Sequence, residues 1–359
     1  MQRIIVRQVD AFTSTPFGGN PAGVITEADT LTTEMMQKIA SEMNLSESAY
    51  VTLPDLPDAD FRLRFFTPEE EVNISGHATI ASCYALFEDG RIPLSDNRST
   101  VNIQTDTGLV QIDIHYHRVG EANDGAEEIG RIRSAHRTSR VPKETTRSEM
   151  RAAHEKDGEV QIINIDDEEI VLEKIMMHQA VHAASPADVS ARTVAEILGI
   201  DVSEIAGTGL PLEIVSTGLT QLFVPILHKE TILDMHPDLI KLGLMNKKNG
   251  IDTNHIFSLD AYREESVSYS RHFAPAVGMW EDPATGTAAA GLAIYLLRHG
   301  AVTSNSMIME QGKSMSELAK IIVDVDEFDG AKGMVRVGGL AVTSIARKIE
   351  IDEDRLVLL

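Results

Sequence analysis

One internal similarity constrains the fold of this sequence more than any other feature. The segments FFTPEEEVNISGHATIASCYALFEDG (residues 65–90) and HFAPAVGMWEDPATGTAAAGLAIYLLRHG (residues 272–300) follow the same order. Each segment is typical of a strand, a proline turn, a variable loop, a helix that begins at a glycine, and a closing glycine. Two similar domains are therefore expected.

The helix in each segment is apolar almost all round. In ATIASCYALF and AAAGLAIYLL few polar residues remain to face water, which indicates a helix enclosed by other structure. Because strands outnumber helices in the first part of the chain, we predict an α+β fold. In this fold each of two pseudo-symmetric domains curves a β-sheet around its central helix. The two helix N-termini would then meet near the boundary between the domains.

The expected domains follow from where core-forming segments occur along the chain. The stretch over 118–158 has almost no large apolar residues and many charges of both signs, so it cannot bury a core of its own. We expect an N-terminal domain over residues 1–117, a charged insertion over 118–158, a C-terminal domain over 159–345, and a tail over 346–359 that returns to the N-terminal domain.

Local patterns predict several elements that can be compared with the structure. Period-two alternation and turn residues indicate strands, and apolar residues at helical spacing with an N-cap candidate indicate helices. The main elements expected in this way are a helix over Leu31–Met43, a strand over Phe61–Phe66, a hairpin over Val101–His117, a helix over Val189–Leu198 and a strand over Glu213–Ile226.

Charge and composition exclude some classes of partner. The 359 residues include 32 Lys and Arg against 55 Asp and Glu, a formal charge of −23, which disfavours nucleic acid and membrane surfaces as partners. No apolar run approaches the roughly 18 residues that a membrane span needs. The lone Cys83 and the strand-like N-terminus, which has no signal-peptide pattern, favour a cytoplasmic protein.

A candidate site follows from the two glycine-initiated helices. A helix N-terminus carries unsatisfied N–H groups and a partial positive charge, and a glycine there lets an anion approach the backbone. His77 lies beside Gly76, and Asp282 and Thr285 precede Gly286, so general acid–base groups accompany the two ends. Three alternatives stay open from the residues alone. Gly76 and Gly286 could serve only the packing of helix on sheet, although their matched occurrence argues against this. Asp282 and Thr285 are also typical helix-capping residues, and His77 could be a core histidine.

Other constellations carry little weight. His115 and His117 share a predicted strand face, but no third ligand accompanies them, and structural or catalytic metal sites use three or four. Nothing matches a phosphate-loop or dinucleotide-binding pattern. We therefore expect neither a metal nor a cofactor.

Taken in order, the motifs of the chain resemble those of the PhzF family, the phenazine-biosynthesis-like relatives of diaminopimelate epimerase. The matching motifs are VDAFTSTPFGGNPAGVI (9–25), NLSESAYV (44–51), RFFTPEEEVNISGHAT (64–79), STGLTQLFVP (216–225), EDPATGTAAAG (281–291), MEQG (309–312) and VRVGG (335–339). The resemblance implies the diaminopimelate epimerase-like fold, with a mixed β-sheet in each domain and an active site between the two domains, and a homodimer.

The resemblance also implies roles for individual residues. The acidic residue of NLSES is the catalytic acid–base group of the family, which corresponds to Glu47, a residue that would not stand out from its own sequence context. The histidine of GHAT and the aspartate of EDPATG correspond to His77 and Asp282 as catalytic partners. The substrate-contacting positions are Asn20, Ser46, Gly76, Gly286 and Thr287.

The expected chemistry is a proton transfer on a small anionic carboxylate compound. Diaminopimelate-epimerase-like enzymes use two cysteines at the two helix starts, where this chain has Ser-Gly-His-Ala and Thr-Gly-Thr-Ala. A single carboxylate on one face suits an isomerisation of the type that PhzF performs on trans-2,3-dihydro-3-hydroxyanthranilate. Two alternatives remain: a racemase or epimerase of amino or hydroxy acids, and a non-catalytic protein that binds a small ligand with the same fold.

Overall fold

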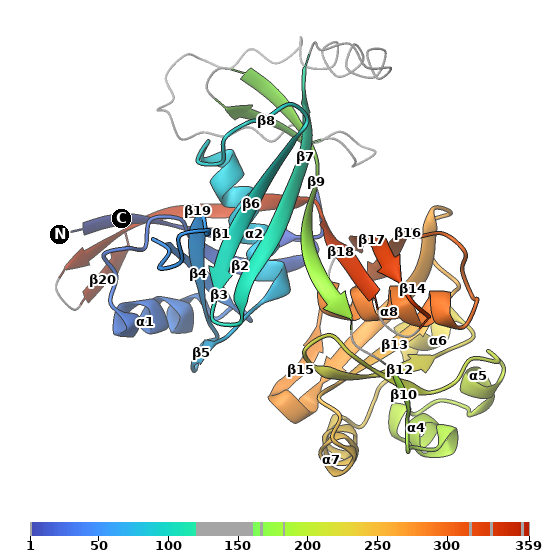
Figure 1. Ribbon diagram of the computed structural model, residues 1–359. Helices are drawn as coiled ribbons and strands as arrows, with labels where there is room; N and C mark the ends of the chain where they lie inside the picture. The colour runs from blue at the N-terminus through green and yellow to red at the C-terminus, as the bar shows by residue number, and fades with distance from the viewer. Residues whose placement is uncertain are drawn as a thin grey trace, which may run out of the picture.

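The computed structural model describes residues 2–119, 161–165, 168–181, 184–315, 318–330, 333–352 and 355–358. Within these ranges the chain forms an N-terminal half around helix α2 (Gly76–Glu88) and a C-terminal half around helix α8 (Gly286–Arg298) (Figure 1). Apart from residues 118 and 119, the expected charged insertion lies outside the described residues.

The N-terminal half consists of strands from both ends of the chain and two helices. Besides α2 it contains α1 (Thr33–Met43), β1 (Gln2–Ala11), β2 (Asn20–Ile25), β3 (Ser48–Thr52), β4 (Phe61–Phe66), β5 (Glu71–Val72), β6 (Arg98–Thr105), β7 (Gly108–Arg118), β8 (Gln161–Ile165), β9 (Glu168–Val181), β19 (Ala341–Asp352) and β20 (Arg355–Leu358).

The C-terminal half has a second mixed sheet with further helices on its outer side. Besides α8 it contains α4 (Ala191–Leu198), α5 (Ser203–Ala206), α6 (Lys229–Asp234), α7 (Leu239–Asn249), the 3-10 turn η2 (Pro275–Val277), β10 (Ser185–Pro186), β11 (Glu213–Ser216), β12 (Thr220–Pro225), β13 (Thr253–Ser258), β14 (Ser266–Ala274), β15 (Met279–Asp282), β16 (Ser306–Gln311), β17 (Ala319–Phe328) and β18 (Gly333–Gly339).

The two halves repeat one strand topology. In the first half β1–β2 is antiparallel, β2–β3 parallel, β3–β4 antiparallel, β4–β6 parallel and β6–β7 antiparallel. Strands β11, β12, β13, β14, β16 and β17 pair in the same alternation. Helix α2 precedes β6 as α8 precedes β16. The internal similarity of the sequence therefore extends over most of each half.

Strand β9 joins the two sheets. Its residues 170–177 pair with β7, and its residues 175–181 pair with β18. The chain then returns to the first half, because β19 pairs antiparallel with β1 from Ala341 onward. In Figure 1 the red β19 runs away from β18 and lies beside the blue β1. The domain limits at 117, 159 and 345 stay predictions.

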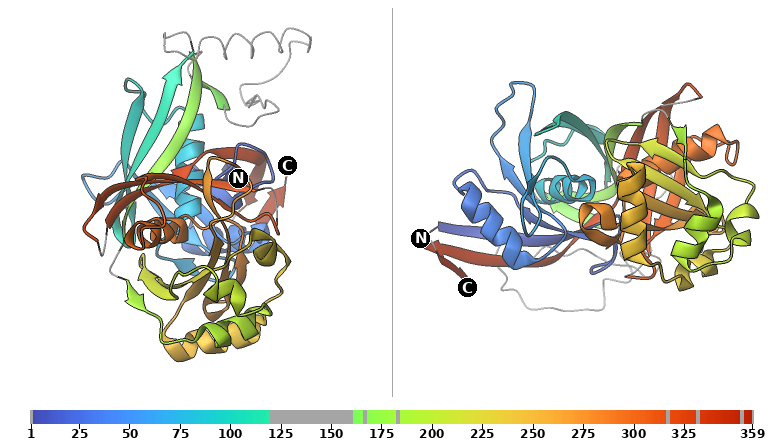
Figure 2. Two further views of the ribbon diagram at one scale, coloured as in Figure 1. Left: turned by 90° about the vertical axis from the view of Figure 1, so that its right-hand side faces the viewer. Right: turned by 90° about the horizontal axis from the view of Figure 1, so that it is seen from below.

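Both central helices are enclosed, as their composition predicts. Every residue of α2 from His77 to Glu88 is buried, and so are all residues of α8 from Ala288 to Leu296. Seen from below, α2 lies among the strands of its half (Figure 2, right). Burying each large aliphatic or aromatic side chain stabilises a fold by roughly 1.5–3 kcal/mol, so these helices anchor the two cores. None of the helices in the described ranges is long and apolar enough to cross a membrane.

Most expected local elements match the structure, with one clear exception. The strand expected over Glu213–Ile226 is wrong, because the segment is the hairpin β11–β12 with a turn at residues 217–219. Gly218 takes a φ of +100° in this turn, which a residue with a Cβ rarely adopts. Helix α1 begins as expected, with the Thr32 side chain accepting a hydrogen bond from the N–H of Met35.

Candidate active site

Glu47 lies in the connection between α1 and β3. Helix α1 ends at Asn44, whose left-handed backbone turns the chain toward β3. The N–H of Gly23 on β2 donates to the carbonyl oxygen of Glu47 over 3.0 Å, which fixes the backbone of this connection. The side chain of Glu47 is 14% exposed. The sequence does not predict this burial, because it results from the pairing of β2 with β3.

His77 is the second residue of α2 and faces Glu47. Its Nε2 lies 3.4 Å from Glu47 Oε2 and 3.4 Å from Ser46 Oγ. Its Nδ1 lies 3.3 Å from Ser75 Oγ. The ring is only 7% exposed, so its two nitrogens are held between polar side chains and not by solvent. This arrangement combines an imidazole and a carboxylate in general acid–base geometry.

Asp282 reaches the same place from the other half. It ends β15, and Asn20 Nδ2 at the start of β2 donates to its Oδ1 over 2.7 Å and to the carbonyl oxygen of Ala284 over 2.8 Å. The hydroxyl of Thr285 donates to Oδ2 over 2.5 Å. Burial raises the pKa of Asp282 to about 6, and the nearby carboxylate of Glu47 adds to the rise. His77, Thr285 and Asn20 oppose the rise by stabilising the charged form.

The N-termini of α2 and α8 lie next to each other. A Cβ placed on Gly76 would lie 3.7 Å from the methyl group of Thr287, in the first turn of α8. Thr285 is the N-cap residue of α8, as the capping alternative expected, but its side chain, like that of Ser75, accepts no hydrogen bond from the first turn of its helix. The Thr285 hydroxyl binds Asp282 instead. The two positive helix ends therefore lie side by side, where they attract an anion.

Two buried acceptor atoms at this place have no hydrogen-bond donor. Asn20 Oδ1 and Glu47 Oε2 are inaccessible to solvent and accept no hydrogen bond from any described residue. A buried acceptor without a donor costs roughly 1–3 kcal/mol. Glu47 Oε2 lies 3.4 Å from His77 Nε2, which is within ion-pair distance. It also keeps a lone pair to which no described group donates a hydrogen bond. Both atoms can accept a hydrogen bond from an N–H or O–H group of a ligand, and the carboxylate of Glu47 can also accept a proton.

The structure brings the predicted site residues together, while their roles stay predictions. Asn20 binds Asp282, and Ser46 and Glu47 lie against His77. The charges of His77 and Glu47 act on Asp282, and Gly76, Gly286 and Thr287 form the adjoining helix ends.

Sequence reasoning missed two of the three residues that hold this cluster together, Ser75 and Gln311, and placed Thr285 there without its partner. Ser75 and Thr285 precede the two helices and bind His77 and Asp282. Gln311 Nε2 donates to the carbonyl oxygen of Asp282 over 2.8 Å, and its Oε1 accepts from the N–H of Thr285. Gln311 belongs to the MEQG motif, which matches a motif of the family but does not predict which residue Gln311 binds.

The described chain offers no alternative site for a metal ion. Within it, no three His, Cys, Asp or Glu side chains are placed to hold a metal ion. Of the two histidines considered for a metal, His117 binds Glu173 through Nδ1 over 2.9 Å. Next to the other, the pairing of β7 with β9 changes register between His115 and Tyr116.

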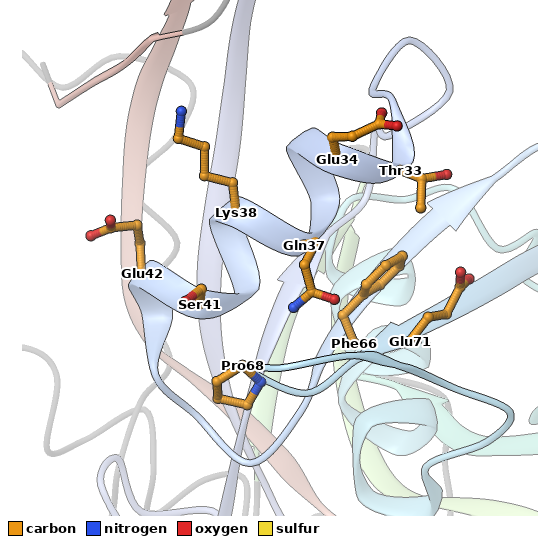
Figure 3. A pocket seen from close by; sticks show the side chains of 9 residues that line it. All are labelled: Thr33, Glu34, Gln37, Lys38, Ser41, Glu42, Phe66, Pro68 and Glu71. Carbon is orange, nitrogen blue, oxygen red and sulfur yellow. The ribbon is translucent and has the colours of Figure 1, made fainter.

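A surface pocket lies apart from this cluster. It has a volume of about 570 Å³ and is formed by α1, the end of β4 and the following turn (Figure 3). Its lining residues are Thr33, Glu34, Gln37, Lys38, Ser41, Glu42, Phe66, Pro68 and Glu71. It contains none of the predicted site residues, and it lacks a buried acid–base pair. The cluster at the helix ends is the better candidate for chemistry.

Comparisons with known proteins were made for the sequence and for the fold. The sequence profile described as phenazine biosynthesis-like protein (PhzC-PhzF) matches residues 9–129 and 132–347. The isomerase YfhB of Bacillus subtilis, described as uncharacterized, is 29% identical over 98% of this chain and 100% of its own length. An uncharacterized isomerase of Clostridium acetobutylicum is 30% identical over 93% of this chain and 94% of its own.

Solved structures of similar fold include members of two groups. A PhzF family protein of Bacillus anthracis is 26% identical and has a TM-score of 0.72 over 98% of this chain and 100% of its own. A hydroxyproline epimerase from Agrobacterium vitis, solved with trans-4-hydroxy-L-proline, is 11% identical and has a TM-score of 0.54 over 98% and 92%. The expected α+β fold of two similar units is confirmed.

Proposed function

Because the chain belongs to the PhzF family of phenazine biosynthesis-like proteins, we propose that it is an isomerase of a small carboxylate compound, with Glu47 as its acid–base group. The observation that carries the proposal is the buried, donor-free Oε2 of Glu47, 3.4 Å from His77 and beside the two helix ends. The reaction as proposed needs neither a metal nor a cofactor, since the side chains supply a base, an acid and an anion site.

The proposed reaction moves one proton within the substrate. The substrate carboxylate lies against the N-termini of α2 and α8, and Glu47 removes a proton from a carbon activated by that carboxylate. The electron pair left on carbon delocalises onto the carboxylate, where the backbone N–H groups stabilise it. Each such donor stabilises the transition state by about 3 kcal/mol in comparable sites. Glu47 then returns the proton to another carbon of the conjugated system, so atoms and charge balance.

His77 and Asp282 position the reacting groups in this proposal. His77 lies against Glu47 and orients its carboxylate, with Ser46 and Ser75 holding the ring. Asp282, whose pKa is raised to about 6, exchanges protons near neutral pH and binds a hydroxyl or amino group of the substrate. Asn20 keeps Asp282 in place across the boundary between the halves.

Replacing Glu47 tests the proposal directly. The purified protein is incubated in deuterium oxide with a panel of small cyclic and amino-acid-like carboxylates, and deuterium uptake is followed by mass spectrometry. For any compound exchanged by the wild type, Glu47→Gln is expected to lower the rate at least 100-fold, because it removes the base but keeps the shape.

The matched control is Glu42→Gln, an exposed glutamate on the neighbouring helix α1. It is expected to exchange deuterium at the wild-type rate. Undiminished exchange in Glu47→Gln would overturn the assignment of the base, and absence of exchange across the panel in the wild type would favour the non-catalytic alternative.

A racemase or epimerase is the second candidate, because Asp282 approaches the site from the half opposite to Glu47. Two acid–base groups on opposing sides can remove a proton from one face of a carbon and return it to the other. Chiral analysis of the deuterated product separates the two candidates. A retained position of the double bond with inverted configuration favours epimerisation, and a shifted double bond favours isomerisation.

The family resemblance also leads us to propose a homodimer that acts in the cytoplasm. Sedimentation equilibrium of the full chain is expected to give twice the 39.3 kDa of one chain. A monomeric mass over micromolar concentrations would contradict the dimer.

A further inference from the structure

A strained loop crosses from the N-terminal half to the helix end of the C-terminal half. Loop 12–20 joins β1 to β2, and Phe12, Phe17 and Gly19 in it all have positive φ, at 65°, 67° and 55°. Positive φ is a marked outlier for a bulky side chain and costs of order 1–3 kcal/mol. Two phenylalanines in this conformation within six residues indicate that the surrounding structure imposes the shape of the loop.

Phe12 is held by the C-terminal half of the chain. Its N–H donates to the carbonyl oxygen of Leu340 over 2.7 Å, and its own carbonyl oxygen accepts from the N–H of Lys320 over 2.9 Å. The side chain is 1% exposed and belongs to the main hydrophobic core. Backbone and ring are therefore both fixed, and the strain at Phe12 is sustained by contacts far away in the sequence.

The ring of Phe12 packs against the first residue of α8. A Cβ placed on Gly286 would lie 3.0 Å from Phe12 Cζ and 3.6 Å from Cε1, and one placed on Gly339 would lie 3.6 Å from Cδ1. A side chain at position 286 would therefore fit only if the ring of Phe12 moved by a few tenths of an ångström. At its other end the same loop leads to Asn20, which binds Asp282 and Ala284 just before α8.

We infer that Phe12 is a positioning residue, which sets the place of the α8 N-terminus and so completes the anion site between the two helix ends. This inference rests on the proposed function, because it concerns the same carboxylate site. Phe12 touches no reacting group in this scheme; it acts through the backbone of Gly286. The strained backbone lets a residue of one half direct its ring at the helix of the other.

Phe17 offers a matched control in the same loop. It is the same residue type with nearly the same φ, but it is 65% exposed, and its N–H is held by Asp10 Oδ2 over 2.6 Å. Phe17→Leu replaces the second phenylalanine with positive φ in loop 12–20, and Phe17 is not among the residues nearest to Gly286. Phe12→Leu and Phe17→Leu therefore differ mainly in whether the ring against Gly286 is lost.

The first test is binding of benzoate, a planar carboxylate probe, measured by isothermal titration calorimetry. Phe12→Leu is expected to weaken benzoate binding about tenfold, since helix-end donors displaced by tenths of an ångström lose part of a charge-assisted hydrogen bond. Phe17→Leu is expected to bind as the wild type does. For a compound exchanged by the wild type, KM should rise more in Phe12→Leu than in Phe17→Leu.

The second test is a double-mutant cycle between Phe12→Leu and Gly286→Ala, measured by urea unfolding. Gly286→Ala alone places a methyl group 3.0 Å from the ring of Phe12 and should lower the urea concentration at which half of the protein is unfolded. In the Phe12→Leu background the same change should lower it less, which demonstrates coupling between the two residues. The same double variant should bind benzoate no more weakly than Gly286→Ala alone.

The outcomes separate the inference from the proposed function. Wild-type benzoate affinity in Phe12→Leu, equal losses in the two leucine variants, or additive unfolding energies would overturn the positioning role. If the wild type binds no benzoate while the cycle shows coupling, the carboxylate site proposed above fails and the packing of Phe12 on α8 stands. A folding defect in Phe12→Leu is recognised by its far-ultraviolet circular dichroism, and Phe12→Met, which keeps an apolar side chain of similar length, then replaces it.

Discussion

At the residue scale, burial sets the protonation of Asp282 in the candidate site. Asp282 is enclosed by Asn20, Thr285 and Gln311, which hydrogen-bond its carboxylate or its backbone. Its pKa of about 6 nevertheless lies above the ordinary value of about 3.9, because desolvation exceeds the effect of these partners. Its proton occupancy therefore changes close to neutral pH.

This shift predicts a pH-dependent effect of Asp282→Asn on stability. Between about pH 4 and 6 the folded state binds a proton that the unfolded state releases, so the contribution of Asp282 to stability is lost as the pH rises through 6. At pH 7.5 the variant should be more stable than the wild type by about 2 kcal/mol, and at pH 4 nearly equal. Urea unfolding at both pH values checks this, and a constant difference would contradict it.

At the element scale, the two central helices perform two tasks with different parts. Their bodies fill the two cores, and their first turns are left for a ligand. The two glycines at these ends differ in what surrounds them. Gly286 is packed against Phe12, whereas a Cβ on Gly76 would meet only Met177 at 3.6 Å and Thr287 at 3.7 Å. These distances to Gly76 are ordinary van der Waals contacts.

Gly76→Ala is therefore expected to separate function from stability. The methyl group fits without a clash, and alanine favours the helix, so the free energy of unfolding should change by less than about 1 kcal/mol. The same methyl group occupies the approach to both helix ends, so benzoate affinity should fall at least tenfold. Calorimetric titration and urea unfolding measure the two effects; unchanged affinity would refute an anion site beside Gly76.

At the scale of the whole molecule, the halves are joined by backbone pairing along one strand. Strand β9 pairs with β7 in one half and with β18 in the other, and β19 returns to pair with β1. At this joint Gly338 lies opposite Met176, and a Cβ on Gly338 would lie 1.8 Å from the carbonyl oxygen of Ile175. Only glycine can take this place in the joint.

Gly338→Ala should therefore destabilise the whole chain. Relief of the clash requires β18 and β9 to separate. We expect this to lower the free energy of unfolding by about 3 kcal/mol or more and to destabilise both halves together. Thermal unfolding followed by circular dichroism measures this loss, with Gly76→Ala as the glycine-to-alanine control. A midpoint within 2 °C of the wild type would show that the joint tolerates a side chain.

Sequence patterns predicted the parts of this protein that depend on local chemistry. The repeated strand–turn–helix block, the enclosed helices and the family resemblance follow from periodicity, glycine positions and motifs, and the structure and the family comparison confirm them. Local pattern failed at Glu213–Ile226, because a three-residue turn at Gly218 divides the segment into two short strands.

Contacts between distant segments were decided only by the tertiary structure. Glu47 would not be distinguished from a surface glutamate by its neighbours; strand pairing buries it beside His77. The pKa of Asp282, the role of Gln311 and the packing of Phe12 on Gly286 likewise depend on residues that lie far away along the chain. Burial and electrostatics arise from what surrounds a group in space, and a linear pattern specifies that only for the segment that contains it.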